Sequence, residues 1–155
     1  MVTIESRVFV DAPIERCFDA ARSPRVHVAA EARAGERIAG GKTSGLFELG
    51  DEVTFEARHL GVRQRLTSRI VAVERPTRFV DEMQRGAFRF LRHTHLFQPE
   101  KEGTVMLDRL ELAAPLGPLG RLAERLFLER YMRAFLERHQ REFRRIVEEG
   151  LMEEG

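Results

Sequence analysis

Apolar and polar residues alternate through most of the chain before Pro115, and this period of two predicts β-strands. The alternating ranges are 2–10, 36–39, 51–59, 62–74, 78–84, 88–97 and 104–114. Between the first two ranges, Asp11 and Pro13 are placed to start a short helix, with Asp11 as its N-cap and Pro13 in its first turn. The alanine-rich stretch 25–34 predicts a second short helix, which Gly35 ends. The pattern therefore predicts six to seven strands, with two short helices after the first.

The pattern changes after Pro115, where apolar residues recur at helical spacing as far as Glu149. They are Leu119, Leu122, Leu126, Met132, Phe135, Leu136, Phe143, Ile146 and Val147. A helix of about 30 residues is roughly 45 Å long, whereas six or seven strands at about 4.8 Å spacing form a sheet about 30 Å wide. We therefore expect one long amphipathic helix that crosses the sheet and buries this stripe. Because one helix cannot fill all the space above a curved sheet, we also expect a cavity between them.

The dipeptide Leu60-Gly61 has the length of a two-residue hairpin connection. Pairing the two flanking strands around it places Phe55 opposite Leu66 on an apolar face and Glu56 opposite Arg65 on a charged face. A slip of one residue would turn every side chain to the wrong face, so the pattern itself favours this register.

Composition limits the classes of protein that need to be considered. With 155 residues, of which 43% are hydrophobic, the chain is large enough for one domain with a real core, which we expect to span residues 1–155. A net charge of +1 gives no bulk attraction to nucleic acid. The single cysteine, Cys17, excludes an internal disulfide and suits a reducing compartment. No secretory signal and no apolar run of about 20 residues is present, so we expect a cytoplasmic protein without integral membrane association.

Several segments resemble those of a known superfamily. They are TSGL (43–46), GDEVTF (50–55), ARHLGV (57–62), FVDEM (79–83), HTHLF (93–97) and PLGPLG (115–120). They are similar to bacterial members of the START-like (Bet v 1-like, SRPBCC, polyketide cyclase/dehydrase) superfamily. The resemblance implies an α+β helix-grip fold, in which a curved antiparallel sheet wraps around a long C-terminal helix. It also implies a hydrophobic pocket for lipids, polyketides or aromatic molecules. We expect no cofactor.

Polar residues interrupt the face that the last two strands are expected to turn toward the helix. A turn at 99–102 pairs His95 with Met106 and His93 with Asp108, so that both histidines and the carboxylate point into the cavity. On the same basis we expect a ligand pocket lined by Phe55, His59, Gln64, Leu66, Phe79, Asp81, Met83, Leu91, His93, His95, Met106, Asp108, Leu110, Met132 and Phe135. Because Phe88 and Phe90 have the opposite parity to the histidines, a bulge near Leu91 would instead turn the histidines outward.

Four interpretations of His93 and Asp108 are open. They form a structural pair that fixes the strand register, or the polar end of a ligand pocket that binds a hydroxyl or carboxylate. A third interpretation is general acid–base catalysis by His93 and Asp108. The fourth is a metal site, in which His93 and His95 would be joined by His59 or Asp108. His27 is interpreted as a surface or gate residue, and His139 as a packing residue of the terminal helix.

Three classes of function follow from the pattern and the resemblance. We expect binding or transport of a small hydrophobic molecule in the pocket between sheet and helix. The alternatives are a cyclase/dehydratase-type enzyme that uses the His–Asp pair, and a non-catalytic interaction module, which includes a possible homodimer.

Overall fold

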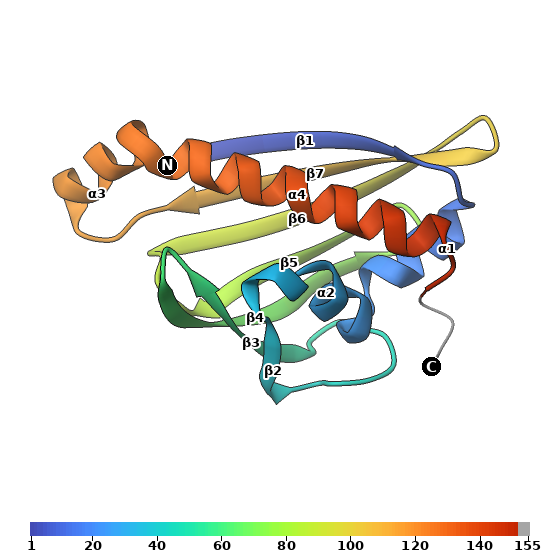
Figure 1. Cartoon of the computed structure of the whole chain (residues 1–155), viewed down its shortest axis with the longest axis horizontal. Coiled ribbons are helices and arrows are strands. Elements are labelled where there is room, and N and C mark those ends of the chain that lie inside the picture. Colours follow the sequence, from blue (N-terminus) through green and yellow to red (C-terminus); the bar gives the residue numbers. More distant parts are fainter. Residues whose placement is uncertain (152–155) are drawn as a thin grey trace.

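The computed structural model describes residues 1–151 and shows seven antiparallel strands in one curved sheet, in the order β1-β7-β6-β5-β4-β3-β2 (Figure 1). The strands are β1 (Val2–Val10), β2 (Arg37–Gly41), β3 (Glu52–His59), β4 (Val62–Glu74), β5 (Arg78–Arg85), β6 (Phe90–Glu100) and β7 (Gly103–Ala113). The helical segments are α1 (Ile14–Ala21), α2 (Pro24–Ala30), the 3-10 turn η1 (Ala32–Ala34), α3 (Gly117–Ala123), the π-helical turn η2 (Glu124–Leu128) and α4 (Glu129–Glu148). This is the helix-grip fold, and the predicted fold class is confirmed.

The first hairpin has the predicted register. Phe55 pairs with Leu66 and Glu56 with Arg65, and the two strands meet at His59 and Val62. Leu60 and Gly61 both have positive φ, as a tight two-residue turn requires.

The second hairpin differs from its predicted register by two residues. His95 pairs with Asp108 and His93 with Leu110, because both strands continue to the two-residue turn at Lys101. A shift of two residues keeps every side chain on its expected face, so both histidines still face inward. The pairing from Phe90 onward is regular, and the bulge considered near Leu91 does not occur.

The predicted cap of the first helix was wrong. Pro13, in extended conformation, is the residue before α1, and no side chain caps this end. The backbone N–H of Asp11 instead donates to the carboxylate of Glu148 at 2.8 Å, which ties the strand end to the terminal helix. The next helix has a conventional cap, since the Ser23 hydroxyl accepts from the N–H of Val26.

The terminal helix runs alongside the edge strand β1, so the expectation that it crosses the sheet was wrong (Figure 1). Segments α3, η2 and α4 together form 32 helical residues. The predicted stripe is buried at five positions, which are Met132, Leu136, Phe143, Ile146 and Val147, and Phe135 is half-buried. Leu119, Leu122 and Leu126 were expected in the core but are 50–65% exposed. They are exposed because α3 and η2 extend past the ends of the strands (Figure 1).

Two apolar clusters lie at opposite ends of the space between sheet and α4. One contains Phe79, Phe97 and Met106 of the sheet with residues of α1 and α2 and the end of α4. The other contains Leu110 and Leu112 of β7 with Met132 and Leu136. Positions 93, 95 and 108 lie between these clusters on their strands.

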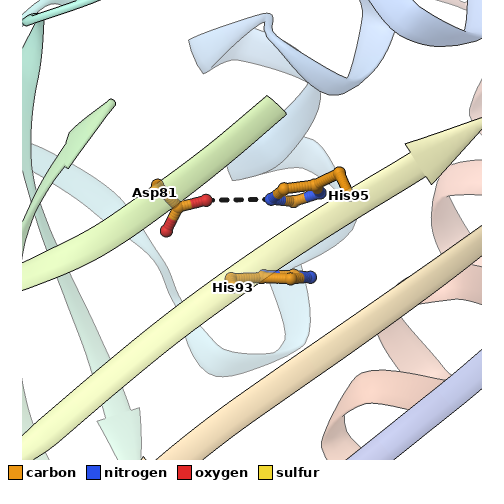
Figure 2. Close-up of side chains that lie close together, drawn as sticks. All are labelled: Asp81, His93 and His95. Carbon is orange, nitrogen blue, oxygen red and sulfur yellow. Dashed lines mark hydrogen bonds and ion pairs between the residues drawn. The ribbon is translucent and has the colours of Figure 1, made fainter. Parts of the chain in front are cut away.

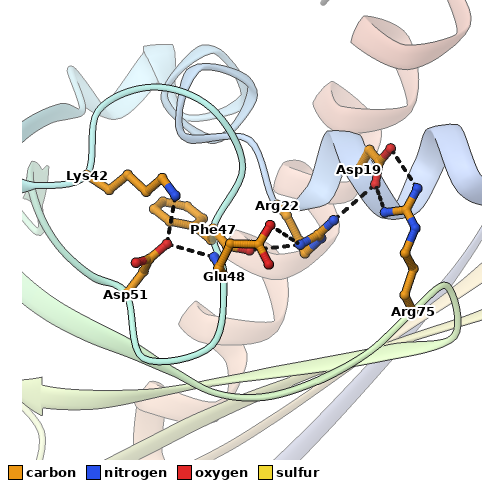
Figure 3. A network of polar contacts seen from close by, with 7 residues as sticks. All are labelled: Asp19, Arg22, Lys42, Phe47, Glu48, Asp51 and Arg75. Atoms are coloured by element: carbon orange, nitrogen blue, oxygen red, sulfur yellow. Dashed lines mark hydrogen bonds and ion pairs between the residues drawn. The ribbon is translucent and has the colours of Figure 1, made fainter.

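A polar network fastens the loop after β2 to the first helix (Figure 3). The buried guanidinium of Arg22 donates to the carbonyl oxygen of Phe47 at 3.0 Å and to Asp19 at 3.2 Å. Asp51 accepts from the Lys42 ammonium and from the N–H of Glu48, at 2.8 and 2.7 Å. These bonds hold the loop in place, and its Phe47 packs with Val53, Phe55 and Ile70.

Candidate ligand-binding site

Four ionisable side chains from three adjacent strands meet on the inner face of the sheet. Asp81 lies on β5 and His93 and His95 lie on β6 (Figure 2), and Asp108 lies on β7. His95 bonds to Asp81 through Nε2 at 2.8 Å and faces Asp108 through Nδ1 at 3.2 Å. His93 Nε2 bonds to Asp108 at 2.8 Å. His95 therefore joins two carboxylates, and Asp108 joins two histidines.

The terminal helix contributes Gln140 to this cluster. Its amide nitrogen donates to the second carboxylate oxygen of Asp108 at 2.7 Å and to the backbone carbonyl of Ser6 at 2.9 Å. The Ser6 hydroxyl in turn donates to the amide oxygen at 2.6 Å. Asp108 thus accepts hydrogen bonds both from the sheet and from the terminal helix. These bonds explain how a carboxylate whose side chain is only 5% exposed is stabilised inside the fold.

Ring stacking holds the two histidines in place. The His95 ring lies between the rings of Phe79 and His93, with centroid distances of 4.0 and 3.7 Å, and Figure 2 shows the two imidazoles nearly parallel.

The two histidines have opposite pKa shifts. Burial acts to lower the pKa of His95, but the bonds to Asp108 and Asp81 outweigh it and raise the pKa to about 9. Burial and the positive charge of His95 lower the pKa of His93, and Asp108 only partly opposes them. For both aspartates burial is outweighed by the histidines, so that the pKa of Asp81 is lowered and that of Asp108 lies well below its ordinary value. At neutral pH the cluster therefore holds one imidazolium, one neutral imidazole and two carboxylates.

A second histidine pair lies beside the cluster. His27 Nδ1 bonds to Glu36 at 2.7 Å, and its ring stacks on Phe55 at 4.2 Å. His139 is paired with the buried Glu31, and its ring is 5.1 Å from that of His27. His27, which the sequence suggests as a surface or gate residue, and His139, which it suggests as packing, both line the inner space with His95 and Asp108.

His59 is separate from these groups. Its Nδ1 is 3.1 Å from the Tyr131 hydroxyl, and its ring contacts Phe135 edge-on at 5.2 Å. This contact joins the tip of the β3–β4 hairpin to α4. All five histidines of the chain thus bond to a carboxylate or a phenol inside the fold.

The other expected pocket residues are distributed over the inner surface. Phe55, Phe79, Met106, Leu110 and Met132 are buried in three different apolar clusters. Gln64, Leu66, Met83, Leu91 and Phe135 remain partly exposed. Leu66 and Met83 both lie close to Gly86.

The space enclosed beside the cluster is small. The cavity next to His95 and Asp108 has a volume of about 20 Å³, which is room for about one water molecule. A larger concavity of about 330 Å³ lies on the outer face of the sheet, and its lining is Val71, Ala72, Arg78, Val80, Glu82, Arg92, Thr94, Leu96, Arg109 and Glu111.

Asp81, His93 and His95 are the residues best placed to hold a metal ion, since one ligand atom from each lies within 4.8 Å of the others. The partner expected from the sequence was His59 or Asp108, and His59 lies elsewhere. Both ring nitrogens of His95 already face carboxylates, so a divalent ion would have to displace its proton. These side chains are therefore better arranged to hold a protonated His95 than to coordinate a metal ion.

Gln140, which completes the cluster, was not among the residues expected from the sequence. A signal for it exists, because Gln140 occupies a position of the apolar stripe between Leu136 and Phe143. A polar residue at such a position requires a buried partner.

Comparisons with known proteins agree with the fold. A family model described as "Polyketide cyclase / dehydrase and lipid transport" matches residues 1–148. No curated protein matches the chain.

Solved structures show the same architecture at low sequence identity. The protein TTHA0849 from Thermus thermophilus is 17% identical with a TM-score of 0.75, and the match covers 94% of this chain and 97% of that one. A Rhodobacter sphaeroides protein is 20% identical with a TM-score of 0.70, covering 97% and 93%. Ara h 8.0201 is 12% identical with a TM-score of 0.60, covering 94% and 97%. Similarity at these identities establishes the fold alone.

Proposed function

This chain belongs to the polyketide cyclase/dehydrase and lipid transport family, and from that premise we propose that it binds a small hydrophobic molecule that carries a hydroxyl group. The observation that supports this most directly is the exposure of the polar cluster. Asp81 and His93 face inward between two apolar clusters, yet their side chains keep 24% and 18% exposure. Such an arrangement, apolar walls with a few convergent polar groups, is typical of small-molecule sites.

Charge favours a hydroxyl over a carboxylate as the polar group of the ligand. The cluster carries two carboxylates and one imidazolium, which leaves a net negative charge. The neutral His93 uses Nε2 to donate to Asp108, so its Nδ1 is left as an acceptor. A phenol or alcohol can donate to this nitrogen or to Asp81, whereas an acid would be repelled.

Binding requires the fold to open. Ligand pockets usually measure about 300–1,000 Å³, and the cavity of about 20 Å³ beside the cluster is far smaller. We take the contact between His59 and Tyr131 as the point of opening, because one hydrogen bond and two edge-on ring contacts of His59 join the hairpin tip to the helix there.

Binding can be tested with 2-naphthol and 2-naphthoate as a matched pair of probes, followed by fluorescence. We expect 2-naphthol to bind at least about tenfold more tightly, a difference of about 1.4 kcal/mol. Leu66→Trp, which fills the inner face of β4, should abolish binding. Val71→Trp, which fills the outer concavity on the same strand, should leave it unchanged. Equal loss in both variants, or tighter binding of the acid, would contradict the proposal.

A second candidate function is general acid–base chemistry on the bound molecule. The observation that favours it is the separation of the two histidine pKa values, since an imidazolium and a neutral imidazole lie in ring contact. In this case His93 Nδ1 would be the base and His95 the electrostatic partner. Conversion of an identified ligand by the wild-type protein, and its loss in His93→Ala with binding retained, would distinguish an enzyme from a carrier.

A further inference from the structure

The start of the terminal helix presents an apolar face that nothing in the described chain covers. The exposed side chains are Leu116, Leu119, Leu122, Leu126 and Phe127, with exposures between 49% and 74%. Leu119, Leu122 and Leu126 have the i, i+3, i+7 spacing of one helix face. Figure 1 shows α3 beyond the N-terminus, past the ends of the strands.

The position of this segment is fixed by its opposite face. The buried Glu124 carboxylate accepts from the N–H of Ala114 at 2.7 Å, directly after β7. Gly120 is buried so close to the carbonyl oxygen of Pro115 that any Cβ would lie 1.9 Å from it. With Gly120 and Glu124 turned toward the strand ends, the leucines must face solvent.

The tip of the β3–β4 hairpin belongs to the same end of the molecule. The bond between His59 and Tyr131 places it one helical turn from Phe127. Leu60 and Val62 at this tip are 63% and 57% exposed. Residues 84–92, between β5 and β6, also reach this end, since the N–H of Arg89 donates to the carbonyl oxygen of Ala113 at 2.9 Å. We call the exposed residues of the hairpin tip, of 84–92 and of 114–130 the apolar–basic end.

The charge of this end is strongly one-sided. Residues 58–65, 84–92 and 114–130 contain nine arginines and two glutamates, whereas the whole chain has 26 basic and 25 acidic residues. One of the two glutamates is the buried Glu124. Three of the nine arginines, Arg63, Arg65 and Arg92, pair with Glu56 and Glu82, which lie just outside these ranges. Arg58, Arg85, Arg121 and Arg125 are exposed, and none forms an ion pair among residues 1–151. Exposed leucines beside unpaired arginines are the pattern of helices that lie on anionic membranes.

Self-association fits this surface less well. A two-fold contact between two copies would bring each arginine near its counterpart, with few acidic side chains to offset the repulsion. Anionic headgroups would neutralise the same arginines while the leucines enter the acyl boundary. No helix of the described residues is long and apolar enough to span a bilayer.

We propose that the apolar–basic end docks peripherally on a membrane surface that carries anionic headgroups. Docking through this end does not depend on the identity of an interior ligand. It would bring the hairpin tip and the Tyr131 contact, where the fold can open, against the lipid.

Sedimentation with vesicles tests the proposal on the full chain. We expect at least about tenfold stronger partition to phosphatidylcholine vesicles with about 30% phosphatidylglycerol than to phosphatidylcholine alone, and a decrease as salt rises. Leu119→Ser with Leu126→Ser should lower partition at least about tenfold. Leu49→Ser is the matched control, because Leu49 is 66% exposed on a different loop.

Charge variants test the contribution of the arginines to vesicle binding independently of the leucines. Arg121→Gln with Arg125→Gln should remove the preference for the anionic vesicles, whereas Arg141→Gln, exposed later on the same helix, should not. Equal partition to both vesicle types, or no partition, would overturn the proposal. So would a dimer in light scattering that the leucine variant dissociates, because the surface would then bind a second copy.

Discussion

His95 is the residue whose chemistry depends most on its neighbours. Its pKa rises from the ordinary 6.5 to about 9 because Asp81 and Asp108 both bond to the imidazolium. A raised pKa means that the folded state keeps the proton to higher pH than the unfolded chain. The stabilisation is therefore complete below about pH 6.5 and is lost as the pH rises through about 9, and its size is on the order of 3 kcal/mol.

Thermal melts between pH 6.5 and 9.5 check this expectation. The wild type should lose stability over that interval, and His95→Gln should show a flatter curve. The depressed pKa values of His93 and His59 act in the opposite direction, since they lower stability as the pH falls below about 6.5. A wild-type curve as flat as that of His95→Gln would show that His95 is not held as a cation.

Asp108 should be the most destabilising position of the cluster. Asp108→Ala removes the partner of His93, His95 and Gln140 at once and leaves buried donors unpaired. We expect a loss of about 3 kcal/mol in urea unfolding. Glu5→Ala is the control, because Glu5 pairs with Arg109 on the exposed side of the sheet and should cost less than about 1 kcal/mol. Similar losses in both variants would mean that the cluster is not satisfied as the geometry indicates.

At the scale of elements, the terminal helix has two parts with different roles. Leu136 on α4 is 2% exposed and Leu126 on η2 is 65% exposed, although both belong to one apolar stripe in the sequence. Leu136→Ala should lower the free energy of unfolding by about 3 kcal/mol. Leu126→Ala should change it by less than about 0.5 kcal/mol. Comparable losses of unfolding free energy for the two variants in urea titrations would contradict the division of the terminal helix into a core part and a surface part.

The loop after β2 depends on one buried guanidinium. Arg22→Met keeps much of the apolar volume but removes the donors to Phe47 and Asp19. We expect a loss of about 2 kcal/mol and faster amide exchange confined to residues 42–51. Arg78→Met, which breaks an exposed pair with Glu74, is the comparison and should have little effect. Unchanged exchange in the loop would show that the network in Figure 3 does not hold it.

At the scale of the whole molecule, the small interior cavity predicts that a ligand enters slowly. If the fold must open before a ligand enters, the observed association rate of 2-naphthol should level off as its concentration rises. Tyr131→Phe removes the hydroxyl that bonds to His59 and should raise the limiting rate. Stopped-flow fluorescence measures both. A rate that rises linearly to the highest concentration would show that the interior is open without a conformational step.

The sequence by itself determined the order of the elements and, where strands pair without a bulge, the face on which each side chain lies. Alternation fixes the parity of a strand, and parity is unchanged by the two-residue shift that separated the predicted from the observed pairing of His95. This is why His93, His95 and Asp108 were correctly placed on the inner face although their partners were not.

Only the tertiary structure decided which groups meet. The bond of His95 to Asp81 depends on the pairing of β5 with β6. The contribution of Gln140 and the placement of His27 and His139 beside the cluster depend on how α4 and α2 sit on the sheet. A helical stripe shows which face of a helix is apolar, but not whether a sheet lies beneath each turn. Leu136 and Leu126 therefore look equivalent in the sequence, and the length of the strands under the helix makes one core and the other surface.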